Sequence, residues 1–76
     1  MMIEKISIET KYITLGQFLK LANVFDSGGM IKHYIRETGV FVNGEKEFRR
    51  GRKLYPEDIV EIEDIGRFIV QDEKNN

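Results

Sequence analysis

The chain has 76 residues, of which 41% are hydrophobic and 33% are charged, and it contains no cysteine. This length allows one domain with a single modest core, and the lack of cysteine excludes disulfides and thiolate metal sites as sources of stability. No apolar run approaches the roughly 20 residues that span a bilayer, and the first residues lack the layout of a secretory signal. We therefore expect a soluble, cytoplasmic protein without a membrane partner.

The formal net charge of −1 hides a strong segregation of charge. Residues 30–53 contain seven Lys or Arg against three Glu, residues 54–76 contain seven acidic residues against two basic ones, and residues 1–29 balance. Such asymmetry is expected of a protein that binds a polyanion and has an acidic far side. The alternative is a solvated charge run that is uneven by chance.

The first part of the chain predicts a strand and a helix. Apolar and polar residues alternate over residues 3–10, which is typical of a strand. Thr14 is a good N-cap, and Gln17 follows three residues later as in a capping box. The apolar face of the helix that follows comprises Leu15, Phe18, Leu19 and Ala22.

A second helix is predicted after the segment DSGG (residues 26–29), with Asp26 or Ser27 as its cap and its end near Thr38. Gly39 then supplies a left-handed C-terminal residue. At about 100° per residue, the side chains divide into two arcs. The arc expected to face the core comprises Met30, Ile31, Tyr34 and Ile35, and the opposite arc comprises Gly29, Lys32, His33 and Arg36.

The opposite arc predicts an anion site. It places Lys32, Arg36 and a third group that can become cationic, His33, close to a helix N-terminus whose free amides already favour anions. Gly28 and Gly29 would let a phosphate backbone approach without obstruction by side chains. Alternatively, the two glycines only make a tight turn between the helices.

A hairpin with a type I′ turn is predicted by the segment VFVNG (residues 40–44), because both residues of Asn-Gly accept positive φ. Val40 and Val42 share the face expected in the core. Phe41 lies on the other face, where it either covers a neighbouring element or stacks on a base. The return strand, residues 45–48, leads into the cluster RRGRK (residues 49–53). These four cations must be solvated or paired with anions, and arginine suits bidentate phosphate recognition.

The remaining segments predict further strands, and the sequence contains no motif of a metal, nucleotide-binding or nucleophilic site. Residues 55–58 form a turn with proline at its second position, residues 59–63 and 66–70 are expected to be strands, and residues 71–76 a frayed tail. His33 is the sole histidine and has no spacing partner for a metal. Nucleotide-binding loops are absent. Asp26, Ser27 and His33 lie too close in sequence to suggest a nucleophilic site. We expect no enzyme activity, cofactor or metal.

The segment VFVNGEKEFRRGRKLYPEDIV (residues 40–60) resembles the S-four-type RNA-binding domain, also called the alpha-L RNA-binding motif. The resemblance covers residues 13–63. LGQFLKLA, DSGG and NGE…RRGRK make the chain most similar to small stand-alone bacterial members, the YaaA- and YbcJ-like proteins. Two family arginines are missing: Thr14-Leu15-Gly16 replaces the usual Arg-Leu-Asp, and Ser27-Gly28 replaces Ser-Arg.

The resemblance implies one α+β domain over residues 1–76, with two short helices packed on a small, mostly antiparallel sheet. In larger members the domain is joined to RNA-modifying enzymes or tRNA synthetases, for which this chain has no room. We expect a monomeric RNA-binding accessory protein whose partners are ribosomal RNA and ribosomal proteins. The residues expected to contact RNA are Gly28, Gly29, Lys32, His33, Arg36, Lys46, Arg49, Arg50, Arg52 and Lys53.

Two other functions are compatible with the sequence. The acidic C-terminal half could make the chain a protein-interaction adaptor, and the same basic surface could bind duplex DNA instead of RNA.

Overall fold

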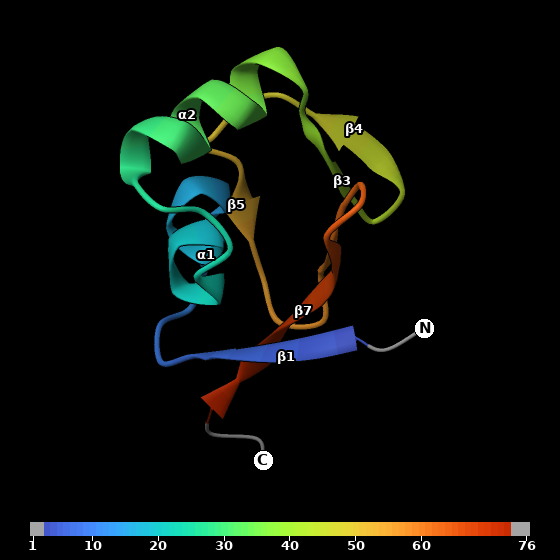
Figure 1. The fold of residues 1–76 in the computed structure, drawn as a ribbon. Coiled ribbons are helices and arrows are strands. Elements are labelled where there is room, and N and C mark those ends of the chain that lie inside the picture. Colours follow the sequence, from blue (N-terminus) through green and yellow to red (C-terminus); the bar gives the residue numbers. More distant parts are fainter. Residues whose placement is uncertain (1–2, 74–76) are drawn as a thin grey trace.

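The computed structural model describes residues 3–73, which form two helices and seven strands (Figure 1). The helices are α1 (Leu15–Ala22) and α2 (Gly28–Glu37). The strands are β1 (Ile3–Ile8), β2 (Ile13–Thr14), β3 (Val40–Val42), β4 (Glu45–Glu47), β5 (Lys53–Leu54), β6 (Ile59–Ile62) and β7 (Gly66–Asp72). Neither helix of this described part is long and apolar enough to cross a membrane.

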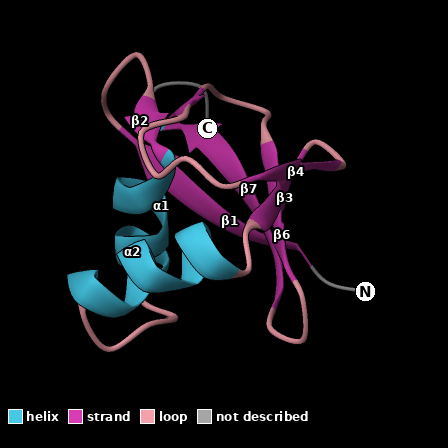
Figure 2. Cartoon of the chain, turned by 90° about the horizontal axis from the view of Figure 1, so that it is seen from above, coloured by secondary structure: helices cyan, strands magenta, loops and turns pink. Residues whose placement is uncertain are grey.

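Five strands form the main sheet in the order β1-β7-β6-β3-β4, and β2 pairs with β5 in a separate two-stranded ladder. All pairings are antiparallel except that of β1 with β7. Figure 2 shows both helices gathered on one side of the sheet. The predicted α+β fold, with two short helices on a mostly antiparallel sheet, is confirmed.

Both helices begin at the capping residues that the sequence indicates. The Thr14 hydroxyl accepts a hydrogen bond from the Gln17 amide at 3.4 Å, and the Ser27 hydroxyl accepts one from the Met30 amide at 3.2 Å. Ser27, rather than Asp26, therefore caps α2. Each of these bonds satisfies an amide in the first helical turn that has no partner within the helix.

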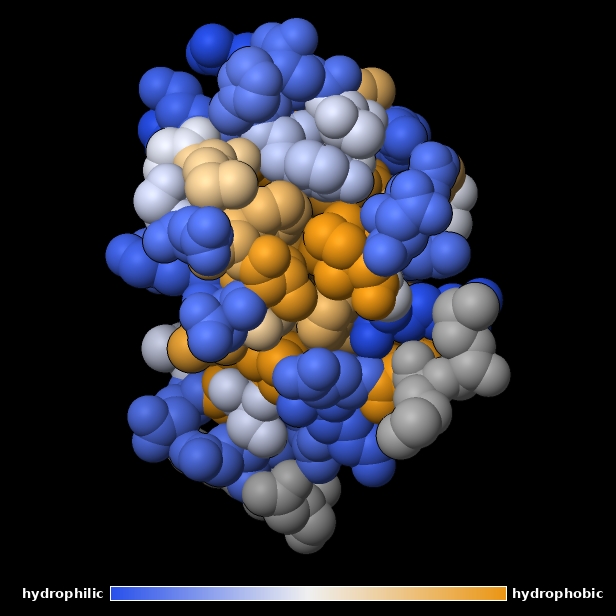
Figure 3. Space-filling model, viewed as in Figure 1, coloured by the Kyte–Doolittle hydropathy of each residue, from blue (hydrophilic) through white to orange (hydrophobic). Residues whose placement is uncertain are grey.

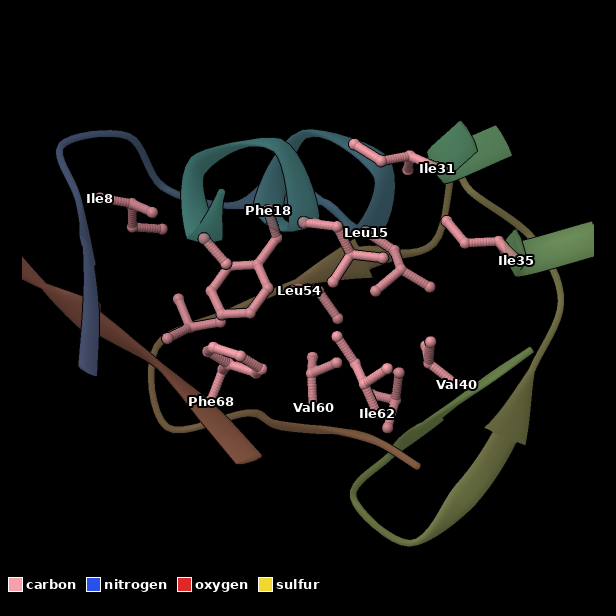
Figure 4. Packing of buried hydrophobic residues seen from close by; sticks show 14 residues of the cluster. Ile8, Leu15, Phe18, Ile31, Ile35, Val40, Leu54, Val60, Ile62 and Phe68 are labelled. Atoms are coloured by element: carbon pink, nitrogen blue, oxygen red, sulfur yellow. The ribbon is translucent and has the colours of Figure 1, made fainter. Parts of the chain in front are cut away.

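The core lies between the helices and the main sheet (Figure 4). Its fully buried side chains come from α1, α2 and alternate positions of the strands, as the apolar periodicity predicts. One prediction is wrong: Met30 is 49% exposed instead of facing the core. The face of α2 that reaches the core is narrow and is occupied by Ile31 and Ile35, while Tyr34 is half-buried against the ring of Phe25.

The hairpin between β3 and β4 turns at Asn43 and Gly44, whose φ angles are 51° and 85°. These positive values confirm the predicted type I′ turn. The Asn43 side chain also joins the hairpin to β6, because its Oδ1 accepts from the Ile59 amide at 2.9 Å and its Nδ2 donates to Asp58 at 3.0 Å. Asparagine therefore both permits the turn and fastens it to the sheet.

The last strand is longer than predicted. Gln71 and Asp72 belong to β7 and align with Ser7 and Ile8 of the parallel strand β1. The expectation of a frayed tail is therefore wrong for these two residues, because β1 supplies them with partners that local sequence does not reveal. Glu73, the next residue of that predicted tail, follows β7, and residues 74–76 lie outside the described residues. Hydrophilic residues surround an apolar area in the middle of the face shown in Figure 3.

Candidate nucleic-acid interface

Four cationic side chains line two adjoining hollows beside the helices. The larger hollow, about 280 Å³, lies between α1, α2 and residues 50–51 and is lined by Lys20, Lys32 and Arg50 among others. The smaller, about 130 Å³, is lined by Lys32, Ile35, Arg36, Phe48 and Arg50. Because Lys32 and Arg50 line both, we treat the hollows as one basic groove, defined by Lys20, Lys32, Arg36 and Arg50.

The basic groove has a positive field that its own surroundings do not neutralise. Of the described residues that line either hollow, none is acidic. All four cations are exposed, and none of them forms an ion pair within the described part of the chain. A concave surface lined by unpaired cations attracts phosphate groups.

Backbone hydrogen bonds hold Arg50 at the start of α1. The amide of Leu15 donates to the carbonyl of Arg52 at 2.8 Å, and the amide of Gly16 donates to the carbonyl of Arg50 at 2.9 Å. These bonds satisfy two amides of the first helical turn. They also fix the segment 50–52 against α1, so that Arg50 faces the cations of α1 and α2 from a defined position.

Glu47 organises the arginines on either side of Arg50. Its buried carboxylate accepts from the guanidinium of Arg49 at 3.1 Å, from Arg52 Nη1 at 3.0 Å, and from the amides of Phe48 and Arg49. The Arg49 guanidinium, with help from Arg52 and the two amides, lowers the pKa of Glu47 to about 2 although burial opposes this shift. The side chains of Arg49 and Arg52 are therefore bonded to Glu47, whereas the Arg50 side chain bonds to none of residues 3–73.

Gly28 occupies the first position of α2 and lines the larger hollow. Its φ is not positive, and a Cβ at this position would meet nothing within 4 Å. Neither the turn between the helices nor packing inside the chain therefore requires glycine here. A tight turn between the helices therefore does not explain the glycine at position 28. The absence of a side chain at Gly28 leaves the basic groove open at the N-terminal end of α2.

The sequence matches the family described as the S4 domain over residues 6–71. The chain belongs to the S4 domain family. A relative from Bacillus subtilis (strain 168), the "Probable ribosome maturation protein RlbA", is 59% identical over 69 residues, which cover 91% of this chain and 97% of the relative. The resemblance stated from the sequence is thereby confirmed.

In this S4 domain the predicted RNA-contacting residues divide between several locations. Gly28, Lys32, Arg36 and Arg50 lie in the basic groove. Gly29 and His33, which share the predicted helix face with Lys32, line a different hollow of about 420 Å³ together with Phe25, Met30 and Tyr34.

Two further predicted cations lie over aromatic rings outside the basic groove. Lys46 Nζ is 4.6 Å from the centroid of Phe41 on the hairpin, and Lys53 Nζ is 5.0 Å from the centroid of Tyr12. Arg49 remains 76% exposed and Arg52 30% exposed despite their bonds to Glu47. Each of these four residues therefore has an intramolecular partner, and their contact with RNA stays a prediction.

Three residues of this S4 domain that shape the site are outside the predicted set. Lys20 is exposed on α1, and the sequence alone cannot place it in one groove with Arg50, because that arrangement depends on how residues 50–52 dock. Phe48 and Glu47 follow no periodic signal either. The one sequence feature that could indicate the role of Glu47 is its position two residues before Arg49 and five residues before Arg52. Among residues 3–73, no group of three or more His, Cys, Asp or Glu is placed to hold a metal ion.

Proposed function

We propose that this protein binds structured RNA through the basic groove and does so without catalysing a reaction. The observation that carries the proposal is the convergence of Lys20, Lys32, Arg36 and Arg50 on one groove, which no acidic residue among residues 3–73 lines. Membership of the S4 domain family supports RNA as the polyanion. Such contacts go to phosphates, so recognition depends on the shape of the RNA more than on its base sequence.

We further propose that the RNA is ribosomal and that the protein acts in the cytoplasm. The support is the name of the Bacillus subtilis relative, which describes a probable role in ribosome maturation, and the identity of 59% along nearly the full length of both chains. Competition of duplex DNA against a ribosomal RNA hairpin at equal salt separates this proposal from DNA binding. We expect the protein to bind the RNA hairpin more tightly than the duplex DNA.

The affinity for RNA is expected to depend steeply on salt. If the four groove cations each neutralise one phosphate, log K falls with log salt with a slope of about −3 to −4, and Arg50→Ala makes the slope shallower by about one. Fluorescence anisotropy of a labelled, fully paired RNA hairpin between about 50 and 200 mM salt measures both slopes. An affinity that does not change with salt would contradict phosphate binding.

Gly28→Ala is expected to change stability and binding in opposite directions. Alanine is a better helix former than glycine, and nothing obstructs its methyl group, so the free energy of unfolding should rise by about 0.5–1 kcal/mol. The methyl group also narrows the groove where the phosphate backbone approaches, so RNA affinity should fall about threefold. Denaturant unfolding and anisotropy give the two values.

Gly29→Ala is the matched control, because Gly29 is also helical but lies outside the basic groove. We expect it to keep wild-type affinity for the hairpin. Equal losses in the two variants would show that the opening at Gly28 has no special role.

A further inference from the structure

We propose that Phe48 is a stacking platform for an unpaired base, so that the protein selects RNA helices interrupted by an unpaired nucleotide. The inference rests on the proposed RNA binding and adds the class of RNA that the basic groove accepts. It is carried by the surroundings of the Phe48 ring, by the way the ring is supported and by the cations beside it.

Phe48 is an exposed aromatic residue inside a cationic groove. It is 52% exposed, follows β4 directly, and lines the smaller hollow together with Lys32, Arg36 and Arg50. Exposing an apolar ring to water next to three cations does not stabilise the fold. A phosphate gains nothing from contact with this ring, but the face of a nucleobase does.

The ring of Phe48 is supported by backbone atoms. Gly39 has φ of 79°, and a Cβ added to it would lie 2.9 Å from Cε1 and 3.1 Å from Cδ1 of Phe48. The ring therefore rests directly on the glycine. The amide of Phe48 is held as well, because it donates to Glu47 Oε2 at 3.0 Å. A ring fixed in this way loses little conformational freedom when a base stacks on it.

The geometry of RNA decides which base can reach this ring. In an A-form helix the bases are stacked on one another and the major groove is too deep and narrow for side chains, so only unpaired nucleotides offer a free face. With Lys32, Arg36 and Arg50 on the phosphates of the same strand, a base turned out of the helix lies close to Phe48. Because phenylalanine has no hydrogen-bonding group, it should accept any base.

The test compares two RNA hairpins with the same stem, one fully paired and one with a single unpaired adenosine in the stem. Both stems are closed by a non-nucleotide linker, so that no loop base is available for stacking. Wild-type protein should bind the interrupted hairpin about tenfold more tightly. Phe48→Leu should lose this preference and bind the two hairpins equally, whereas Phe48→Tyr should keep the preference. Tyr55→Leu is the matched control, because Tyr55 is 48% exposed but lines neither hollow of the basic groove; it should bind like the wild type.

A second measurement reports stacking directly. In proton NMR, the ring resonances of Phe48 should move upfield when the interrupted hairpin is added and stay in place with the paired one. Equal affinity of the wild type for both hairpins, or an unchanged preference in a folded Phe48→Leu variant, would overturn the stacking proposal alone. Failure to bind either hairpin would overturn RNA binding by the groove and the stacking proposal with it.

Discussion

Replacing both Lys32 and Arg50 by glutamate is expected to lower the affinity for RNA by about 100-fold. These are the two residues that line both hollows of the basic groove, so the double change places negative charge along its whole length. Each substitution removes a phosphate contact and adds repulsion. Neither side chain bonds to another described residue, and both are exposed, so the fold should be retained.

The control for this variant must change the net charge equally. Lys5→Glu combined with Arg67→Glu does so on β1 and β7, outside the basic groove. Arg67 contributes only a long 3.9 Å pair with Glu61, its register partner, and both side chains are exposed. Replacing Arg67 by glutamate therefore places two solvated carboxylates opposite each other and should lower stability only slightly. Anisotropy with the paired RNA hairpin compares the two proteins. Equal losses of affinity would mean that net charge, rather than the groove, determines binding.

Glu47→Gln is expected to lower the free energy of unfolding by about 2–3 kcal/mol at neutral pH. Glutamine cannot offer the charged acceptor to which Arg49 and Arg52 now donate. The side chain is 9% exposed, so water replaces these bonds poorly. In a domain of this size such a loss is a large fraction of the total stability. Urea unfolding monitored by circular dichroism measures the change.

The pH dependence of the stability of Glu47→Gln shows whether the lost stability comes from the carboxylate charge. The pKa of Glu47 is about 2 in the folded chain and 4.5 ordinarily, so the carboxylate stabilises the fold fully above pH 4.5. That contribution is lost as the pH falls from about 4.5 to about 2. Glu47→Gln should therefore be less sensitive to acid over this interval than the wild type. Glu61→Gln serves as the control, since Glu61 is 47% exposed, and it should retain wild-type acid sensitivity.

The parts of the fold that the sequence predicts correctly depend on neighbouring residues. Thr14 and Ser27 cap helices through bonds to amides three positions later, and Asn43-Gly44 turns a hairpin because both residues accept positive φ. These preferences act within a few residues, so they do not require knowledge of the tertiary structure. The apolar face of α1 follows from helical periodicity in the same way.

The candidate site was only partly predictable, because its composition depends on contacts between distant segments. A helical wheel groups His33 with Lys32, but residues 50–52 dock beside Lys32 and Arg36 and leave His33 in another hollow. From the sequence, the four cations of residues 49–53 are equivalent, and each is either solvated or paired with an anion. The structure divides it, because the turn after β4 places Arg49 and Arg52 on Glu47 and leaves Arg50 free.

The parallel pairing of β1 with β7 has a consequence for how the chain is made. Ile3 aligns with Arg67, and β1 pairs with no other strand of the described residues. During synthesis, β1 leaves the ribosome before β7, so its amides and carbonyls have no strand partner until β7 follows. Closing a loop of about 60 residues is slow compared with forming a local hairpin. The β3–β4 hairpin needs only local contacts, so it can form before β1 has its partner.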